Sequence, residues 1–116
     1  MAVPLEIEIR TEGDVGIVVL SGHLDTVSSA AADVALIELV TSNAKIHVVD
    51  LSGVSFVASS GLRVLLKAVK ALRRRKTKLL LAGMAPGVHE VFAVSGFLAF
   101  FKVYDSLDAA LVATRT

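Results

Sequence analysis

The sequence contains no cysteine. This absence excludes a disulfide scaffold, a zinc site built on thiolates and a cysteine nucleophile. No apolar stretch approaches the roughly 20 residues that a membrane-spanning helix needs. The opening residues MAVPLEIEIR alternate in charge and lack the apolar core of a signal peptide. We therefore expect a cytoplasmic protein that does not insert directly into a membrane.

The sequence also lacks the common motifs of catalysis and cofactor binding. It has no Gly-x-Gly-x-x-Gly or Walker loop, no Gly-x-Ser-x-Gly nucleophile elbow and no His-Glu-x-x-His. The three histidines, His23, His47 and His89, fall in different predicted elements. Asp50 ends a buried strand, but no second carboxylate accompanies it, so a hydrogen bond to the following loop is favoured over a direct functional role. We expect no enzyme activity, no cofactor and no metal site.

Charge gives little reason to expect a nucleic-acid partner. The formal net charge is only +1. Arg63, Lys67, Lys70 and Arg74 follow one face of a predicted helix that runs into the basic stretch 73–76. A solvated polar face is favoured over a phosphate-binding site, because such residues also complement the negative end of the helix dipole. No aromatic residues interleave with these charges, which disfavours single-stranded nucleic acid.

What is present predicts a single α/β domain over residues 1–116. The hydrophobic fraction of 54% is sufficient for a real core. Alternation and β-branched runs predict strands, and apolar residues at helical spacing predict helices. The strands are expected at Leu5–Arg10, Val15–Leu20 (closed by Ser21 and Gly22), Ile46–Leu51, Leu79–Ala82 and Phe100–Tyr104. The helices are expected from 25–29 to about Thr41, from Ser59 or Ser60 past Leu72, from Pro86 to Gly96, and from Asp105 or Ser106 through Leu111. The order β-β-α-β-α-β-α-β-α predicts a mostly parallel central sheet, with the first strand antiparallel at one edge and the helices mainly on one side.

The most informative segment is Val54–Leu62, which follows a buried strand and opens a helix. A helix N-terminus presents free backbone N–H groups and a partial positive charge. A serine there can cap the helix, or it can accept a phosphate that those N–H groups would hold. The residues alone favour capping, but two adjacent serines, Ser59 and Ser60, leave room for both roles.

Within this segment, Ala58-Ser59-Ser60-Gly61-Leu62 resembles the signature Asp-Ser-[Ser/Thr]-Gly-Leu of the STAS domain family, the family of the anti-sigma factor antagonists. Three other parts of the chain resemble family segments in the same order. They are Gly22–Asp25, the stretch from Pro86 to Phe97, and Val103–Leu111. The resemblance covers nearly the whole chain. It departs from the signature at one place, where Ala58 replaces the aspartate and so removes a carboxylate beside the first serine.

The resemblance implies a regulatory binding protein from a bacterium. Such an antagonist binds a serine kinase that is also an anti-sigma factor, which frees a sigma factor for transcription. The kinase phosphorylates the first serine of the signature, here Ser59, and a phosphatase resets the switch. The residues expected to bind the partner are Asp25 of the earlier loop, Ser59, Ser60, Gly61 and Arg63. Arg63, four residues after Ser59, is also expected within reach of a phosphate on that serine.

Other functions stay open from the sequence. A STAS subunit can dock on a transporter or a sensory complex without a phosphorylation cycle. An enzyme with an unrecognised site, a nucleotide-binding role and a purely structural role are further alternatives. We expect the loops after Leu20 and Leu51 to converge at one end of the sheet. We also expect a bulky residue at Gly61 to weaken partner binding while leaving the fold intact.

Overall fold

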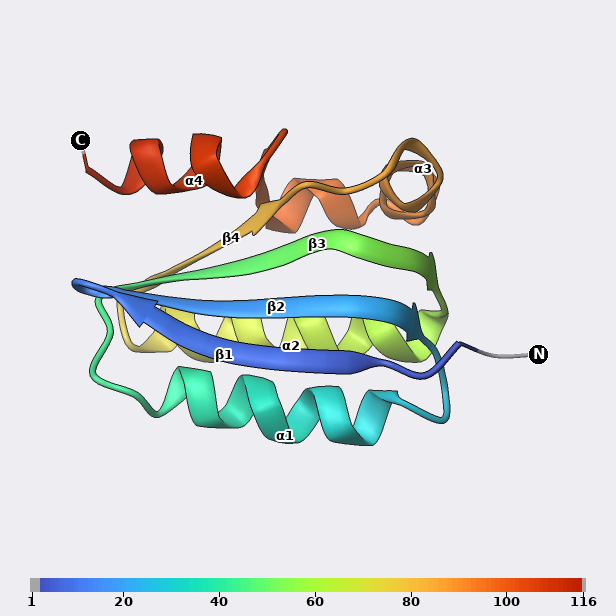
Figure 1. Ribbon diagram of the computed structural model, residues 1–116, viewed down its shortest axis with the longest axis horizontal. Helices are drawn as coiled ribbons and strands as arrows, with labels where there is room; N and C mark the ends of the chain where they lie inside the picture. Colours follow the sequence, from blue (N-terminus) through green and yellow to red (C-terminus); the bar gives the residue numbers. More distant parts are fainter. Residues whose placement is uncertain (1–2, 116) are drawn as a thin grey trace.

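The computed structural model describes residues 3–115, which form a five-stranded sheet with α-helices against it (Figure 1). In chain order the elements are β1 (Glu6–Glu12), β2 (Val15–Leu24), α1 (Ser29–Val40), β3 (Ile46–Val57), α2 (Ser59–Arg74), β4 (Lys78–Ala82), α3 (Pro86–Val94), the 3-10 helix η1 (Phe97–Phe100), β5 (Lys102–Tyr104) and α4 (Leu107–Thr114). None of the described helices combines the length and hydropathy required to cross a bilayer.

The sheet has the predicted, mostly parallel topology. Its strands lie in the order β1-β2-β3-β4-β5. β1 pairs antiparallel with β2 at one edge, and each later pair of neighbours is parallel. The charged residues of β1 suit an edge strand, because exposed charges discourage pairing with another chain. The strand is exposed along its length except at the half-buried Ile7.

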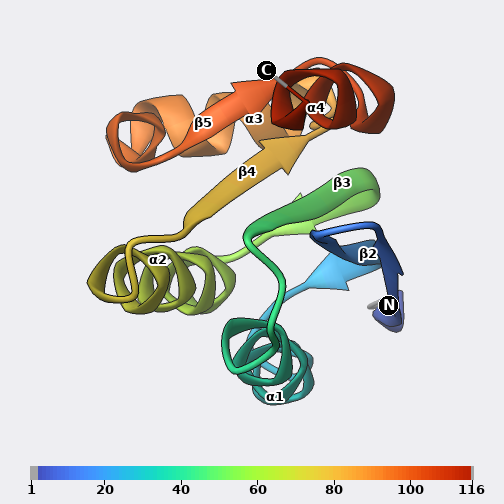
Figure 2. The ribbon, with the colours of Figure 1, turned by 90° about the vertical axis from the view of Figure 1, so that its left-hand side faces the viewer.

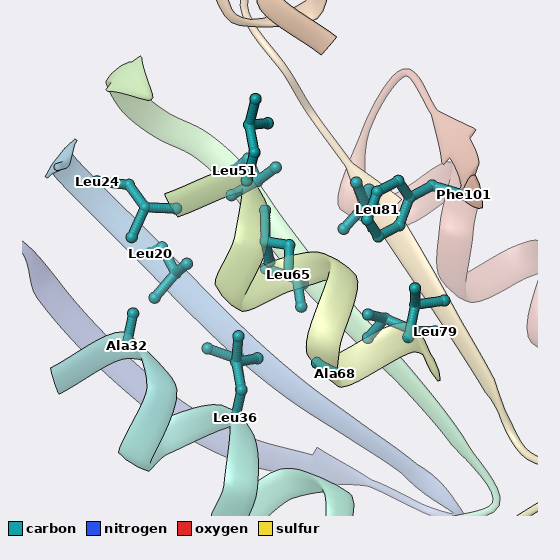
Figure 3. Close-up of a cluster of buried hydrophobic side chains, with 14 of the residues drawn as sticks. Leu20, Leu24, Ala32, Leu36, Leu51, Leu65, Ala68, Leu79, Leu81 and Phe101 are labelled. Carbon is teal, nitrogen blue, oxygen red and sulfur yellow. The ribbon is translucent and has the colours of Figure 1, made fainter. Parts of the chain in front are cut away.

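Helices cover both faces of the sheet, but unequally (Figure 2). α1 and α2 pack on one face, where Leu20, Leu36, Leu65 and Leu81 belong to one buried cluster (Figure 3). α3 adds Val88 and Phe92 to the same cluster. α4 packs on the opposite face, where Ala110 joins a smaller cluster with Val48, Leu80 and Ala82. The prediction of helices mainly on one side is therefore confirmed. The two-sided burial also explains why the first half of β3, residues 46–51, and β4 are mostly apolar.

The second and third strands extend further than predicted. Ser21 and Gly22 look like a strand end in the sequence, yet β2 continues to Leu24 and stays paired with β3 through shifts of register. Gly22 permits this with a φ of 101°, and a Cβ at that position would collide with the carbonyl oxygen of Pro4. β3 likewise runs to Val57 rather than ending at Leu51.

The aromatic segment before the last strand also differs from the prediction. Phe100 lies in η1 rather than in a strand, and β5 begins only at Lys102. The rings of this segment pack edge to face, with Phe97 against Phe100 at 6.3 Å and Phe101 against Phe92 at 5.8 Å between centroids. Aromatic packing therefore sets the local conformation in place of strand pairing.

Two polar side chains bind nearby backbone N–H groups: Ser106, one of the two predicted caps of the last helix, and Asp50, whose partner lies within β3 and not in the loop that the sequence predicts after it. Ser106 caps α4, because its Oγ accepts a hydrogen bond from the Ala109 N–H at 3.0 Å. The carboxylate of Asp50 accepts the Ser52 N–H at 3.0 Å, which ties the middle of β3 to the residues that follow. Each bond satisfies a backbone donor that would otherwise depend on water.

His47 is a buried polar residue whose ring nitrogens have no hydrogen-bond partner among the described residues. Its side chain is fully buried in β3, beside the backbone of Gly16 and close to Leu39. Burial lowers the pKa of His47 from its ordinary value of 6.5, and the positive charge of Arg75 lowers it further. The folded protein therefore holds this imidazole neutral.

We predict that His47 makes the fold less stable as the pH falls through 6.5. Below that value the unfolded chain binds a proton at this residue and the folded chain does not, so protons favour unfolding. The free energy of unfolding should fall by up to about 1.4 kcal/mol per pH unit from this group. Urea unfolding between about pH 7.5 and 5.5 measures this slope. His47→Leu should flatten it, whereas His89→Gln, at an exposed position, should leave it unchanged. A wild-type slope in His47→Leu would contradict the assignment.

Candidate functional site

Two loops meet at the carboxyl end of β2 and β3, as the sequence predicts. Leu24 and Val57 are parallel neighbours at the ends of these strands. The Ala58 N–H donates to the carbonyl oxygen of Leu24 at 2.9 Å, which joins the start of α2 to the loop before α1. Figure 1 shows α1 and α2 starting at the same end of the sheet. We name the surface formed by Asp25, Val27, Phe56, Ser59 and Arg63 at this end the switch surface.

Gly61 sets how closely α2 approaches β2. A Cβ on Gly61 would lie 2.6 Å from Cγ and 2.9 Å from the carbonyl oxygen of Leu24. Gly61 is itself buried. The expectation that a bulky residue here would leave the fold intact is therefore wrong, because Leu24 or the first turn of α2 would have to move. Any effect of Gly61 on a partner acts through this packing.

The start of α2 carries no side-chain cap among the described residues. Ala58 is the N-cap, with extended backbone at φ −93° and ψ 171°, and its methyl group accepts no hydrogen bond. Ser59 and Ser60 follow as the first two helical residues, past the N-cap position from which a hydroxyl caps. The interpretation of a serine as the cap is therefore wrong. The uncapped start leaves backbone N–H groups of the first turn accessible to an anion.

The two serines lie in different surroundings. Ser59 is exposed, whereas Ser60 is half-buried and its Oγ lies 3.4 Å from the Oγ1 of Thr26 in the neighbouring loop. Ser60 thus helps to join the two loops. Ser59 is the more accessible hydroxyl. Arg63 follows one turn later and is exposed, so its guanidinium adds positive charge to the same end of α2.

Asp25 holds the shape of the loop before α1. Its carboxylate accepts the N–H groups of Val27 and Ser28, both at 3.0 Å. The bond from Ser28 is the main reason why the pKa of Asp25 lies below its ordinary value. The Ser28 hydroxyl accepts the Asp25 N–H at 2.9 Å and donates to the carbonyl oxygen of His23 at 2.8 Å. The half-buried carboxylate is therefore engaged with its own loop.

Two exposed apolar side chains at this end were missed by the sequence reasoning. Val27 is 88% exposed, and Phe56 is 49% exposed. The Phe56 ring packs against the imidazole of His23, with 5.5 Å between centroids. Val27 is hidden in the sequence among polar capping residues, and Phe56 lies in a stretch expected to be loop. An apolar residue in such a polar turn is the signal that could have drawn attention to Val27.

Two hollows of about 410 Å³ lie away from the switch surface, one lined by residues of α2, β4 and the η1–β5 segment and one between the β1–β2 turn and α4. Neither is lined by a residue of the switch surface. Within residues 3–115, His, Asp and Glu side chains form no group of three that could hold a metal ion.

Comparison with known proteins identifies what this arrangement resembles. The sequence model of the STAS domain matches residues 6–110. BtrV of Bordetella bronchiseptica is 35% identical over 97 residues, which cover 84% of each chain. The anti-sigma F factor antagonist of Paenibacillus polymyxa is 31% identical over 108 residues, or 92% of each chain. The crystal structure of an anti-sigma factor antagonist from Mycobacterium paratuberculosis superposes with a TM-score of 0.86 at 26% identity, covering 97% of this chain and 96% of the other.

We predict that Gly61→Ala destabilises the fold by about 1–3 kcal/mol, because overpacking against Leu24 forces a local shift. Urea unfolding followed by circular dichroism measures this loss. Gly87→Ala is the matched control, since Gly87 also lies in the first turn of a helix and a Cβ there would meet nothing within 4 Å. The control should be neutral or slightly stabilising. Equal stabilities of Gly61→Ala and the wild type would contradict the packing role of this glycine.

Proposed function

Because this chain belongs to the STAS domain family, we propose that it is an anti-sigma factor antagonist of a bacterial cytoplasm. It binds an anti-sigma factor of the serine kinase type and so frees a sigma factor for transcription. Relatives named as anti-sigma factor antagonists, which match almost end to end, support this assignment. The observation that carries the proposal is an exposed serine at the uncapped start of α2. The role is one of binding rather than catalysis.

The switch surface provides what a protein interface needs. Val27 and Phe56 offer apolar area that a partner can desolvate, and such anchors dominate binding energy. Ser59 and Arg63 add exposed polar groups in the first turns of α2, which begins two residues after β3. Asp25, Ser60 and Gly61 contribute by fixing the two loops relative to each other. Binding thus depends on a surface whose shape is set before the partner arrives.

Phosphorylation of Ser59 is the proposed control. A phosphate adds about −1.5 to −2 charges at neutral pH. At this position the uncapped N–H groups of α2 and the positive charge of Arg63 stabilise the anion, so the domain stays folded. The cost falls on the interface, where a dianion would have to lose its water. Ala58 leaves these N–H groups without a competing carboxylate, but it also removes the group that a kinase or phosphatase of this family could recognise beside the serine. Removal of the phosphate by a phosphatase restores binding.

We predict that the cognate kinase modifies Ser59 and not Ser60. Purified protein incubated with ATP and the serine kinase anti-sigma factor of its own cell should gain one phosphate, located by mass spectrometry. Ser59→Ala should abolish the modification, and Ser60→Ala should retain it. Ser59→Asp should weaken binding about 100-fold, equivalent to about 3 kcal/mol.

Two results would count against this switch. Phosphate on Ser60 alone would reverse the assignment of the two serines. The second result is that the kinase adds no phosphate and the Ser59→Asp variant binds with full affinity. The protein would then be a binding module without a phosphorylation cycle, such as a subunit that docks on a transporter or a sensory complex.

We predict that Val27→Ala and Phe56→Ala each weaken binding of the anti-sigma factor by roughly 10- to 100-fold, because truncation removes apolar contact at the interface. Isothermal titration calorimetry measures the affinity. Val94→Ala is the matched control, since Val94 is 81% exposed at the last residue of α3. Unchanged binding by both test variants would show that the partner uses another face. Thermal unfolding of each variant separates loss of contact from loss of fold.

A further inference from the structure

α1 exposes large apolar side chains on its outer side, next to the charged Glu38. Its inner face buries Ala32, Ala35, Leu36 and Leu39 against the sheet. Its outer face exposes Val34 (65%) and Ile37 (48%). A helix on the surface of a soluble domain is normally polar on the side that faces water. α2 follows this rule, with its charged residues on the outside, and α1 does not.

The outer face of α1 continues into a groove against α2. Figure 2 shows the two helices side by side on the same face of the sheet. We name the hollow between them the helix groove. It is lined by Asp33, Leu36, Ile37 and Val40 from α1 and by Lys67, Ala68 and Ala71 from α2. Its volume of about 60 Å³ is far below the roughly 300 Å³ of a small-molecule site. The groove therefore suits a protruding side chain of another protein.

The α2 wall of the helix groove belongs to a strongly basic segment of the chain, although Lys67 is the only basic residue of that segment that lines the groove itself. Eight of the 12 Lys and Arg residues lie between Arg63 and Lys78, a segment without Asp or Glu. This segment carries +8, and the rest of the chain carries −7 because it has four basic and 11 acidic residues. The overall charge of +1 hides this separation. Lys67 pairs with Asp33 at 3.1 Å, whereas Lys70 and Arg74, exposed on the same side of α2, form no ion pair within the described residues.

We propose that the helix groove binds an acidic amphipathic helix of a protein partner. Apolar side chains of such a helix, spaced at i, i+3, i+4 and i+7, would pack on Val34, Ile37 and Ala71. Its acidic side chains would face Lys70 and Arg74. Charge complementarity selects this occupant, because a two-fold pairing with a second copy would place one basic α2 against another. The surface lacks the aromatic residues typical of a helix that lies in a membrane interface.

This inference is independent of the proposed function. Arg63 of the switch surface and Lys67 of the helix groove lie one turn apart on α2. The residues varied in the test below, such as Val34, Ile37, Lys70 and Arg74, are not part of the switch surface. Loss of the helix groove would leave the switch surface in place. The two can therefore fail or succeed separately in experiment.

The test uses a labelled synthetic peptide of about five helical turns, with leucines along one face and glutamates on the other faces. Fluorescence anisotropy measures its binding to the full chain. We expect binding that weakens with added salt, and at least about tenfold weaker binding by the double variant Val34→Glu, Ile37→Glu. Val112→Glu is the matched control, because Val112 is 59% exposed on α4 at the opposite face. It should bind like the wild type.

A second pair of variants keeps the test valid if the first pair misfolds. Lys70→Glu with Arg74→Glu changes exposed residues only and should also weaken binding at least about tenfold, whereas Lys45→Glu should not. The proposal is overturned if the peptide does not bind, or if a scrambled peptide of equal composition binds as well. It is also overturned if the variants bind the peptide as well as the wild type does. Two further results would overturn it by pointing to another occupant: binding to vesicles of phosphatidylcholine and phosphatidylserine, without peptide binding, that the groove variants abolish, or a dimer in sedimentation that the same variants disrupt.

Discussion

The parallel pairing of β2 with β3 is the constraint on which the rest of the molecule depends. The pairing continues through shifts of register as far as Leu24 and Val57, so the loops after both strands begin at the same end of the sheet. The hydrogen bond from Ala58 to Leu24 then fixes the first turn of α2 against the end of β2. Gly61 makes the approach sterically possible. The accessible serine, its neighbouring loop and the exposed apolar anchors all take their positions from this junction.

Much of the fold was predictable because it depends on periodicity. The alternation in β1, the apolar runs of β3 and β4 and the stripe of α2 each identify an element without knowledge of its neighbours. Errors arose where a tertiary contact overrides the local pattern. Gly22 looks like a strand end but adopts a positive φ within a strand. Phe100 has the β-propensity of a strand residue but lies in a 3-10 turn packed on Phe97.

The site was predictable at the level of which loops meet, and less so at the level of individual side chains. Strand order alone brings the loops of Asp25 and Ser59 to the same end of the sheet. Sequence cannot tell that the Asp25 carboxylate turns back to Ser28, since this depends on the path of a single tight loop. It also cannot tell that Gly61 is buried against Leu24, because that contact joins residues far apart in the chain.

If Ser59 is phosphorylated as proposed, the alanine at the N-cap of α2 has a consequence in a cell that holds several proteins of this fold. An acidic N-cap would stabilise the helix by about 0.5–2 kcal/mol relative to alanine, so this chain retains a weaker helix start. In exchange it presents a neutral, shorter side chain beside Ser59. A kinase that recognises a carboxylate at that position loses a contact with this chain. A kinase whose site accommodates only the methyl group of alanine excludes a related protein that carries an aspartate there. One side chain can thereby insulate parallel circuits from cross-talk while the shared scaffold stays the same.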